Sequence, residues 1–373
     1  MIIFRYLGKE VYGTLLASTF ILLVVLISNQ FVHYLTQAAS GVIPIRSVMQ
    51  IMSIQIPLLS GILLPLGLYL GILMAYGRLY VDREMTVLWA CGFGKGQLLQ
   101  YTVMFSVLVA VVVALLMLWI QPTVESYKRH ILLQAATASP LEKVFPGQFT
   151  ELGDSKLTFY VENLSRDHQR LEHIFAAQPQ KNPKSALPAW NIVVAEQGHQ
   201  AVDPVSGDRF LVLKDGYRYT QTPGQLDFQV VKYQTYGIRI EPNVLPADKR
   251  VEAIPTSVLW PARHQSLEYA AEMQWRMSLP LMALILALIA VPLSKVDPRQ
   301  GRFAQLLPAL LLYTVYLNLL FVAKVWVTKG KIPASIGLWG VHGVMLIVAL
   351  GLLLRFMGWK AVWKSDANFK KVH

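Results

Sequence analysis

The sequence predicts an α-helical polytopic membrane protein with six transmembrane helices and an all-β, jelly-roll-like domain between the third and fourth helices. The first observation behind this fold class is composition, because 54% of the 373 residues are hydrophobic and only 15% are charged. Such a chain is too apolar for an ordinary soluble domain. The second observation is order, since a long polar stretch separates an N-terminal group of apolar runs from a C-terminal one.

Apolar runs of about 20 residues cross the ~30 Å hydrocarbon core of a membrane at ~1.5 Å per residue. On this basis the expected spans are residues 11–32, 48–76, 98–120, 277–292, 303–327 and 336–357. The first run is too long for the core of a cleavable signal, and no small-residue cleavage site follows it. We therefore expect it to remain as a span.

The second run is longer than a hydrocarbon core requires and contains two informative pairs of residues. Pro57 and Pro65 each remove a backbone donor and crowd the preceding turn, so we expect kinks there. Gly67 and Gly71 form a small-xxx-small pair, which lets another helix approach closely. This run is therefore predicted to bend and to present a packing face.

A polar stretch at residues 78–96, RLYVDREMTVLWACGFGKG, separates the second and third runs. We expect a short helix over residues 81–90, ended by Gly92 in the left-handed conformation that glycine favours. The spacing i, i+4, i+7, i+8 places four apolar residues on one face: Val81, Met85, Leu88 and Trp89. An amphipathic helix of this kind is predicted to dock on the lipid headgroups or on a soluble partner.

The polar stretch at residues 123–262 begins with a predicted helical stalk and changes to β-type texture beyond Pro146. Short runs rich in β-branched and aromatic residues, such as LTFYV and WNIVVAEQ, alternate with clusters of Gly, Pro, Asn and Asp. Strands at this spacing are typical of a sandwich or jelly-roll-like pair of sheets. The expected domains are thus 1–122, 123–262 and 263–373, the last ending in a basic tail.

Charge predicts the orientation of the spans. A net charge of +12 would suggest nucleic acid for a soluble protein, but much of it lies here in short loops beside apolar spans. The N-terminus, residues 78–96, the loop 295–302 and the tail are rich in Lys and Arg, whereas the short loops on the other side carry only Arg46, Lys329 and Lys331. The positive-inside rule therefore predicts cytoplasmic termini, a β domain outside and no nucleic-acid partner.

Residues that would carry catalysis or hold a cofactor are missing from the sequence. The run GFGKG from Gly92 to Gly96 resembles a nucleotide-binding loop, but it lacks the Ser or Thr after the lysine and the strand before it. The histidines have no metal-ligand spacing. The single cysteine, Cys91, excludes an intrachain disulfide and is expected to act as a small hydrophobe. We therefore expect a chain that is not an enzyme and binds no cofactor.

Lys324 is the ionisable residue of most interest, because it lies near the outer end of the fifth span. One interpretation is that its side chain extends to the interface. The other is that it faces a cavity and pairs with an anionic group such as a lipid phosphate. Gln30, His33 and Asn318 are weaker polar candidates at a similar depth, and each is equally suited to a hydrogen bond between helices.

Three segments carry a resemblance to a known family: MIIFRYLGKE at the start, LYVDREMTVLWACGFGK at residues 79–95 and PLSKVDPRQGR at residues 292–302. Together with three spans, a β domain and three spans, they resemble the lipopolysaccharide export permeases of the LptF/LptG family. The resemblance implies two related permease chains, an LptG-like partner included, that take lipopolysaccharide from the outer leaflet of a Gram-negative inner membrane. It also implies two cytoplasmic LptB-like ATPase subunits as the source of energy, and β-jellyroll domains that pass the lipid in the periplasm towards an LptC-like bitopic protein.

The resemblance also assigns roles to individual residues. Residues 81–90 correspond to a coupling helix that docks in an ATPase groove, with Glu84 at the acidic coupling position, where it would pair with an arginine. Lys324 corresponds to a basic position at the outer rim of the lipid cavity. Where some family members have basic residues near the end of the first span, this chain has Gln30 and His33.

Three alternatives remain beside a non-catalytic lipopolysaccharide transport subunit. A membrane subunit of another ABC-type complex, moving lipoprotein or relaying force, would share the coupling helix. A secondary transporter would need repeated halves and buried ligands for a coupling ion. A membrane enzyme would need a nucleophile, base or metal set near a membrane face. The sequence favours the transport subunit, because it contains neither of the latter two sets of features.

Overall fold

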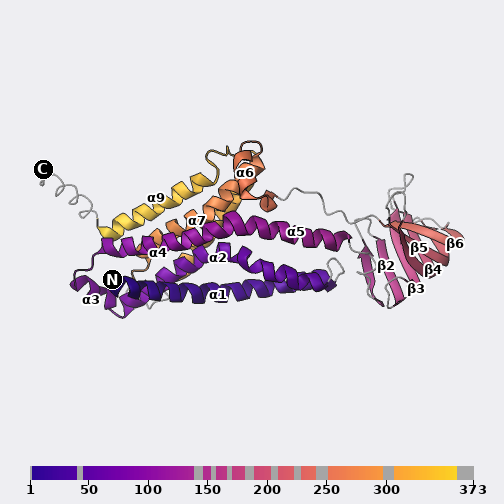
Figure 1. Cartoon of the computed structure of the whole chain (residues 1–373), viewed down its shortest axis with the longest axis horizontal. Coiled ribbons are helices and arrows are strands. Elements are labelled where there is room, and N and C mark those ends of the chain that lie inside the picture. Colours follow the sequence, from indigo (N-terminus) through magenta and orange to yellow (C-terminus); the bar gives the residue numbers. More distant parts are fainter. Residues whose placement is uncertain are drawn as a thin grey trace. The chain divides into compact units, whose positions relative to one another are not determined.

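The computed structural model describes residues 2–39, 45–137, 146–152, 157–165, 170–180, 189–202, 209–221, 228–240, 251–296 and 306–358. The chain divides into two compact units. The helical unit comprises Met1–Ser28, Ile54–Tyr127 and Lys249–His373, and the sheet unit comprises Asn29–Ser53 and Lys128–Asp248. Figure 1 shows the elements with their labels.

Six helices of the described chain are long and apolar enough to cross a membrane, which confirms the predicted number of spans. They are α1 (Ile2–Ala39), α2 (Ile45–Val81), α4 (Lys95–Leu115), which continues through the π-helical segment η1 (Leu116–Ile120) into α5 (Gln121–Thr137), α7 (Leu267–Leu293), α8 (Leu306–Thr328) and α9 (Gly337–Met357). Three short elements complete the helical unit: α3 (Glu84–Ala90), the 3-10 turn η3 (Val251–Ala253) and α6 (Thr256–Ala262).

Helix α7 is central to the helical unit, since it packs against α4, α8 and α9. Its apolar stretch after Met277 is almost continuously buried. The helix begins at Leu267, ten residues before the start expected from hydropathy. Its first turns carry polar residues that are buried within the protein, and a hydropathy profile assigns such residues to a loop.

Gly67 and Gly71 lie on α2 where it meets α1. A Cβ atom added to Gly71 would lie 2.9 Å from the carbonyl oxygen of Val11, and one added to Gly67 would collide with the side chain of Thr19. Glycine is therefore required for this close approach. The predicted packing face of the second span is confirmed, and its partner is the first span of the same chain.

The transition from α4 to α5 contains no break, although the sequence changes character at Pro122. Proline has no backbone N–H, so the carbonyl of Leu118 receives no helical i to i−4 hydrogen bond. The preceding residue, Gln121, donates instead to Leu116, five residues back, which makes the π-helical segment η1. The expected boundary at residue 122 thus falls inside a continuous helix.

The described residues of the sheet unit form six antiparallel strands in the order β1-β2-β3-β4-β5-β6. They are β1 (Phe149–Leu152), β2 (Leu157–Leu164), β3 (Arg170–Gln180), β4 (Ala189–Val202), β5 (Arg209–Gln221) and β6 (Phe228–Ile240). Each strand pairs with its neighbour in the chain, so the described strands form one meander. The all-β domain between the third and fourth spans is confirmed, whereas the second sheet of a jelly roll is not found among these strands.

One face of this sheet is apolar and buried. Phe159 on β2 pairs with Ala176 on β3, and Ala176 pairs with Val193 on β4, so the three side chains lie side by side on the buried face. The alternation shifts by one residue at His173 and Asp215, which have positive φ angles and lie where the pairing skips a residue. The neighbouring strand omits one residue at the same place in each case, so the register is the same on both sides of the skip.

Candidate functional site

The helical unit brings different parts of the chain together at each of its ends. At one end the hydroxyl of Tyr6, in the first turns of α1, donates to Glu84 of α3. The ammonium of Lys95, at the start of α4, donates to the carbonyl of Phe356 near the end of α9 at 2.7 Å. Helix α6 and the start of α7 lie at the opposite end (Figure 1), where Lys324 contacts Glu272 of α7.

Helix α3 is shorter than the sequence predicted. Arg83 has a φ of 60°, a left-handed conformation that interrupts the helix, so α3 begins at Glu84 rather than Val81. Val81 is the last residue of α2. At the other end Gly92 has a φ of 88°, which confirms the predicted left-handed glycine after the helix.

The apolar face predicted for this helix packs largely within the chain itself. Met85 is fully buried, and Leu88 and Trp89 pack against the same core. The Trp89 ring contacts the ring of Tyr80 edge to face. Val87, which the helical spacing placed off this face, is 61% exposed. The surface that α3 offers to another molecule therefore centres on Val87.

Glu84 belongs to a polar cluster that joins α1, α2 and α3. Its Oε2 atom accepts a hydrogen bond from Tyr6 at 2.6 Å. Arg78 donates to the Tyr6 oxygen at 3.4 Å and forms ion pairs with Glu10 at 3.1 Å and Asp82 at 3.9 Å. Because Tyr6 and Glu10 lie on α1, a displacement of α3 through Glu84 would act directly on the first span.

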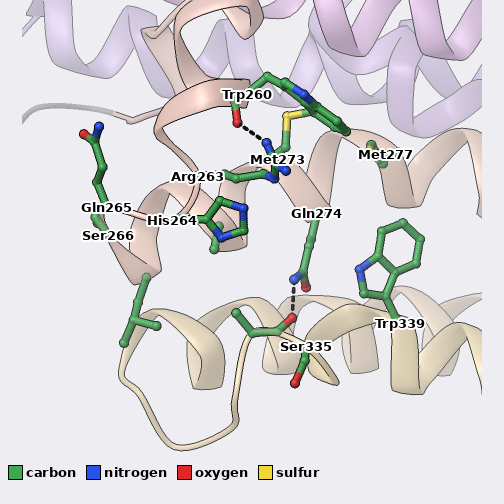
Figure 2. Close-up of a pocket in the computed structure, with 13 residues that line it drawn as sticks. Trp260, Arg263, His264, Gln265, Ser266, Met273, Gln274, Met277, Ser335 and Trp339 are labelled. Atoms are coloured by element: carbon green, nitrogen blue, oxygen red, sulfur yellow. Dashed lines mark hydrogen bonds between the residues drawn. The ribbon is translucent and has the colours of Figure 1, made fainter.

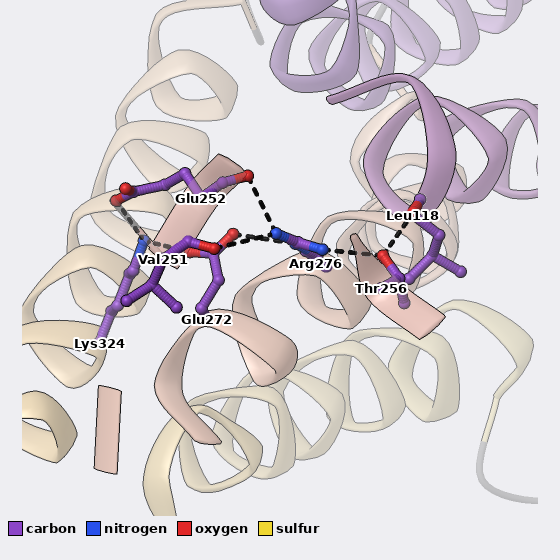
Figure 3. Close-up of polar contacts among 7 residues, drawn as sticks. All are labelled: Leu118, Val251, Glu252, Thr256, Glu272, Arg276 and Lys324. Atoms are coloured by element: carbon purple, nitrogen blue, oxygen red, sulfur yellow. Dashed lines mark hydrogen bonds and ion pairs between the residues drawn. The ribbon is translucent and has the colours of Figure 1, made fainter. Parts of the chain in front are cut away.

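Lys324 is paired with carboxylates of its own chain (Figure 3). Its Nζ atom lies 2.8 Å from Oε2 of Glu272 and 3.7 Å from Oε1 of Glu252. The same ammonium lies 5.3 Å from the ring centroid of Trp275. The side chain is 22% exposed and Glu272 is 1% exposed, whereas Glu252 is 43% exposed. Lys324 thus has one buried anionic partner and one accessible one.

Glu272 is shared between Lys324 and a second cation, Arg276. The Arg276 side chain is fully buried, and its Nε atom donates to Oε1 of Glu272 at 3.0 Å. Its other nitrogens donate to the carbonyl oxygens of Val251 and Glu252 and to the hydroxyl of Thr256. Two cations and two carboxylates therefore form a neutral cluster, which is the arrangement that makes buried charge tolerable.

The cluster reaches α4 through Thr256. The hydroxyl of Thr256 donates to the carbonyl oxygen of Leu118, the carbonyl that Pro122 leaves without a helical partner. It also accepts the hydrogen bond from Arg276. The third span, the residues that follow the sheet unit in the chain, and the fourth span are therefore connected by consecutive polar contacts.

Sequence reasoning missed Glu272 and Arg276 as functional candidates. Their i, i+4 spacing, with the acidic residue first, is the signal that predicts a helical ion pair. It was overlooked because hydropathy alone placed Arg276 at the outer edge of a span beginning at Met277. The buried pair shows instead that the helix continues into the protein on that side.

The family model described as lipopolysaccharide export system permease LptF/LptG matches residues 5–355. The chain belongs to the LptF/LptG family. The curated LptF permease of Escherichia coli strain K12 is 30% identical over 374 residues, which cover 100% of this chain and 99% of that protein. LptF of Shigella flexneri has the same identity and coverage.

Membership of the family makes this chain a permease of the lipopolysaccharide export system and a multi-pass membrane protein. Of the segments that carried the resemblance, the start of α1 and residues 79–95 form the Glu84 end of the helical unit. Residues 298–302, with the PRQGR sequence, and the basic tail beyond residue 358 lie outside the described residues.

The other polar residues predicted for lipid contact are distributed differently. Gln30 and His33 lie on the part of α1 that belongs to the sheet unit, whereas Lys324 belongs to the helical unit. The His33 ring is exposed and lies 2.9 Å from the Gln37 amide. Asn318 donates to the carbonyl of Thr314 within α8. The described His, Cys, Asp and Glu residues form no group that could hold a metal ion.

Proposed function

We propose that this permease extracts lipopolysaccharide from the outer leaflet of the inner membrane and passes it to a periplasmic bridge, driven by two LptB-like ATPase subunits. An LptG-like permease would complete the cavity, and an LptC-like bitopic protein would receive the lipid. The observation that carries this proposal is the match to LptF over essentially the full length of both chains. The chain itself acts without catalysis in this proposal, since its role is to bind lipid and to transmit motion.

Helix α3 is the proposed coupling helix. It lies at the end of the helical unit that also holds the start of α1, and the positive-inside rule favours the cytoplasm for that end. Val87 provides an exposed apolar contact for an ATPase groove. Met85 and Trp89 fix α3 to the permease core. Glu84 connects α3 to Tyr6, so a displacement of α3 by the ATPase would be transmitted directly to α1.

Lys324 is the proposed contact for a lipopolysaccharide phosphate, with Gln30 and His33 as further candidates on α1. Glu272 is buried and also pairs with Arg276, so an incoming phosphate would compete with the exposed Glu252 for the ammonium. Val251 and Glu252 of η3 also accept hydrogen bonds from Arg276. Release of the Glu252 carboxylate would therefore loosen the segment that leads from the sheet unit to α7.

Native mass spectrometry of the complex purified from its own membranes tests this function, because it reports partners, stoichiometry and bound lipid together. We expect two ATPase copies, a second permease and bound lipopolysaccharide. A complex that carries a lipoprotein, or no lipid at all, would favour another ABC-type membrane subunit. A chain that purifies without any ATPase would contradict the coupling role of α3.

A further inference from the structure

A pocket of about 570 Å³ lies between the α6–α7 turn and the start of α9, within the helical unit. Figure 2 shows Arg263 and His264 on the turn, Met273 and Met277 along α7, and Trp339 in the first turn of α9. None of these residues belongs to the Lys324 cluster. On α7, Met273 and Met277 share a face by their i, i+4 spacing, and that face differs from the one that carries Glu272 and Arg276.

The pocket is held open by hydrogen bonds rather than by chance packing. The side chain of Ser266 caps the start of α7 by accepting a hydrogen bond from the amide of Glu268. The Gln274 amide donates to the carbonyl of Ala334 and accepts from the backbone N–H of Leu338, which fixes the start of α9 against α7. These hydrogen bonds fix the first turn of α7 and hold the start of α9 against α7, and both elements line the pocket.

The lining of the pocket combines apolar walls with positive charge. Seven of its residues are apolar, and no aspartate or glutamate is among them. Arg263 uses one nitrogen to donate to the carbonyl of Trp260 at 2.7 Å, and its guanidinium lies 4.6 Å from the Trp260 ring. An arginine has five N–H donors, so most of them remain available for an acceptor entering the pocket. His264 is exposed beside it.

The position of the pocket indicates which kind of hydrogen-bond acceptor it would bind. Trp260 and Trp339 line it, and tryptophan side chains are enriched at the level of the lipid headgroups. The continuous apolar part of α7 begins at Met277, and α9 begins at Gly337, so the pocket lies where the hydrocarbon ends. In other membrane proteins, pockets with basic side chains between transmembrane helices bind phosphate-containing headgroups.

We propose that this pocket binds an anionic glycerophospholipid, with the headgroup phosphate at Arg263 and His264 and the first part of an acyl chain against Met273, Met277 and Trp339. The site goes beyond the proposed export function, since it lies on a different face of α7 from Glu272, the partner of Lys324. A volume of about 570 Å³ is within the ~300–1,000 Å³ of sites for small molecules. It admits one headgroup and the first part of one chain, so the remainder of the lipid would extend into the bilayer.

Native mass spectrometry of the delipidated full-length chain in detergent tests this proposal, with phosphatidylglycerol and phosphatidylcholine titrated separately. We expect tighter binding of phosphatidylglycerol, and about fivefold weaker binding of it in Arg263→Gln, as the loss of one phosphate contact predicts. Ala270→Phe, which fills the pocket, should weaken the binding of both lipids. Lys331 is an exposed cation in the segment between α8 and α9 and does not line the pocket. Lys331→Gln should therefore leave binding unchanged.

Three outcomes would overturn the proposal. The first is equal binding of the two lipids that neither Arg263→Gln nor Ala270→Phe alters. The second is displacement of phosphatidylglycerol by inorganic phosphate alone, which would make the ligand a free anion. The third is displacement by lipid A, which would assign the pocket to the export path. Each of these is independent of whether the chain assembles with ATPases, so failure here is distinct from failure of the proposed function.

Discussion

The ammonium of Lys324 lies 2.8 Å from the carboxylate of Glu272, which is 1% exposed and also pairs with Arg276 at 3.0 Å. A residue that the sequence presents as a free cation near a membrane surface is therefore held in place by an anion from a different span. A lipid phosphate that binds Lys324 would therefore replace the carboxylate of Glu252, which is exposed, and not that of Glu272, which is buried.

Glu272→Gln should destabilise the helical unit strongly. The substitution leaves the buried Arg276 and the partly buried Lys324 without their shared carboxylate, and removal of one partner from a buried pair costs about 3–5 kcal/mol. The thermal unfolding midpoint of the purified protein measures this effect. Glu268→Gln removes an exposed carboxylate one turn earlier on α7 and serves as the control. Equal midpoints for the two variants would refute the structural role of Glu272.

Lys324→Gln and Glu252→Gln should change lipopolysaccharide binding in opposite directions. Loss of the ammonium should weaken photocrosslinking to lipopolysaccharide by roughly fivefold, the effect of one cation at a headgroup. Loss of the exposed carboxylate removes the competitor for Lys324 and should strengthen crosslinking. If both variants crosslink like the unmodified protein at equal protein levels, Lys324 serves only to pair with Glu272.

Glu84→Ala should uncouple the ATPase subunits from the permease while leaving it folded. The carboxylate is partly exposed and holds α3 to Tyr6, and α3 keeps its anchor through the buried Met85. We expect weaker ATPase co-purification and slower lipopolysaccharide release. Glu268→Gln, at the opposite end of the helical unit, should change neither. Intact docking and export in Glu84→Ala and Glu84→Arg together would exclude the coupling role of Glu84.

The two faces of α3 should respond differently to substitution. Met85→Ala creates a cavity in the core and should cost about 2–5 kcal/mol of stability. Val87→Asp leaves the core intact but introduces a charge on the exposed apolar surface, so it should lower ATPase affinity roughly five- to thirtyfold, a loss of ~1–2 kcal/mol. Unfolding midpoints and ATPase co-purification separate the two effects. A Val87→Asp variant that binds ATPase normally would place docking elsewhere.

Thr256→Val should loosen the connection between α4 and α7. It leaves the Leu118 carbonyl and one N–H group of Arg276 without partners, at a cost of about 1–3 kcal/mol. Thr256→Ser keeps the hydroxyl and should restore most of the lost stability. Hydrogen exchange of α6 and η3 measures the effect, and protection in Thr256→Val equal to that of Thr256→Ser would argue against the contact.

The architecture of this protein was accessible from its sequence. Hydropathy is a property of neighbouring residues, so local pattern predicted the six spans and the β-strands of the intervening stretch. The left-handed Gly92 and the close-packing pair Gly67 and Gly71 were also correct, since both depend on what glycine alone permits. Helix ends were less accurate, because polar residues buried by other segments resemble loops in a hydropathy profile.

Local pattern placed the face of α3 correctly but not its partner. The amphipathic spacing showed that Met85, Leu88 and Trp89 share a side, yet only the packed core shows that this side is covered by the same chain. The exposed surface therefore centres on Val87. Cys91, expected to behave as a small hydrophobe, is likewise exposed.

The sequence by itself determined the membrane class, the number of spans, the position of the β domain and the family. The tertiary structure alone decided which charges neutralise one another and which apolar faces remain free. Glu252 lies on η3, Glu272 and Arg276 lie on α7, and Lys324 lies on α8. The pairing between these three elements depends on how segments distant in the chain pack together. A charge is stable inside a membrane protein only beside its partner, and no local window of sequence contains both Lys324 and its carboxylates, Glu252 and Glu272.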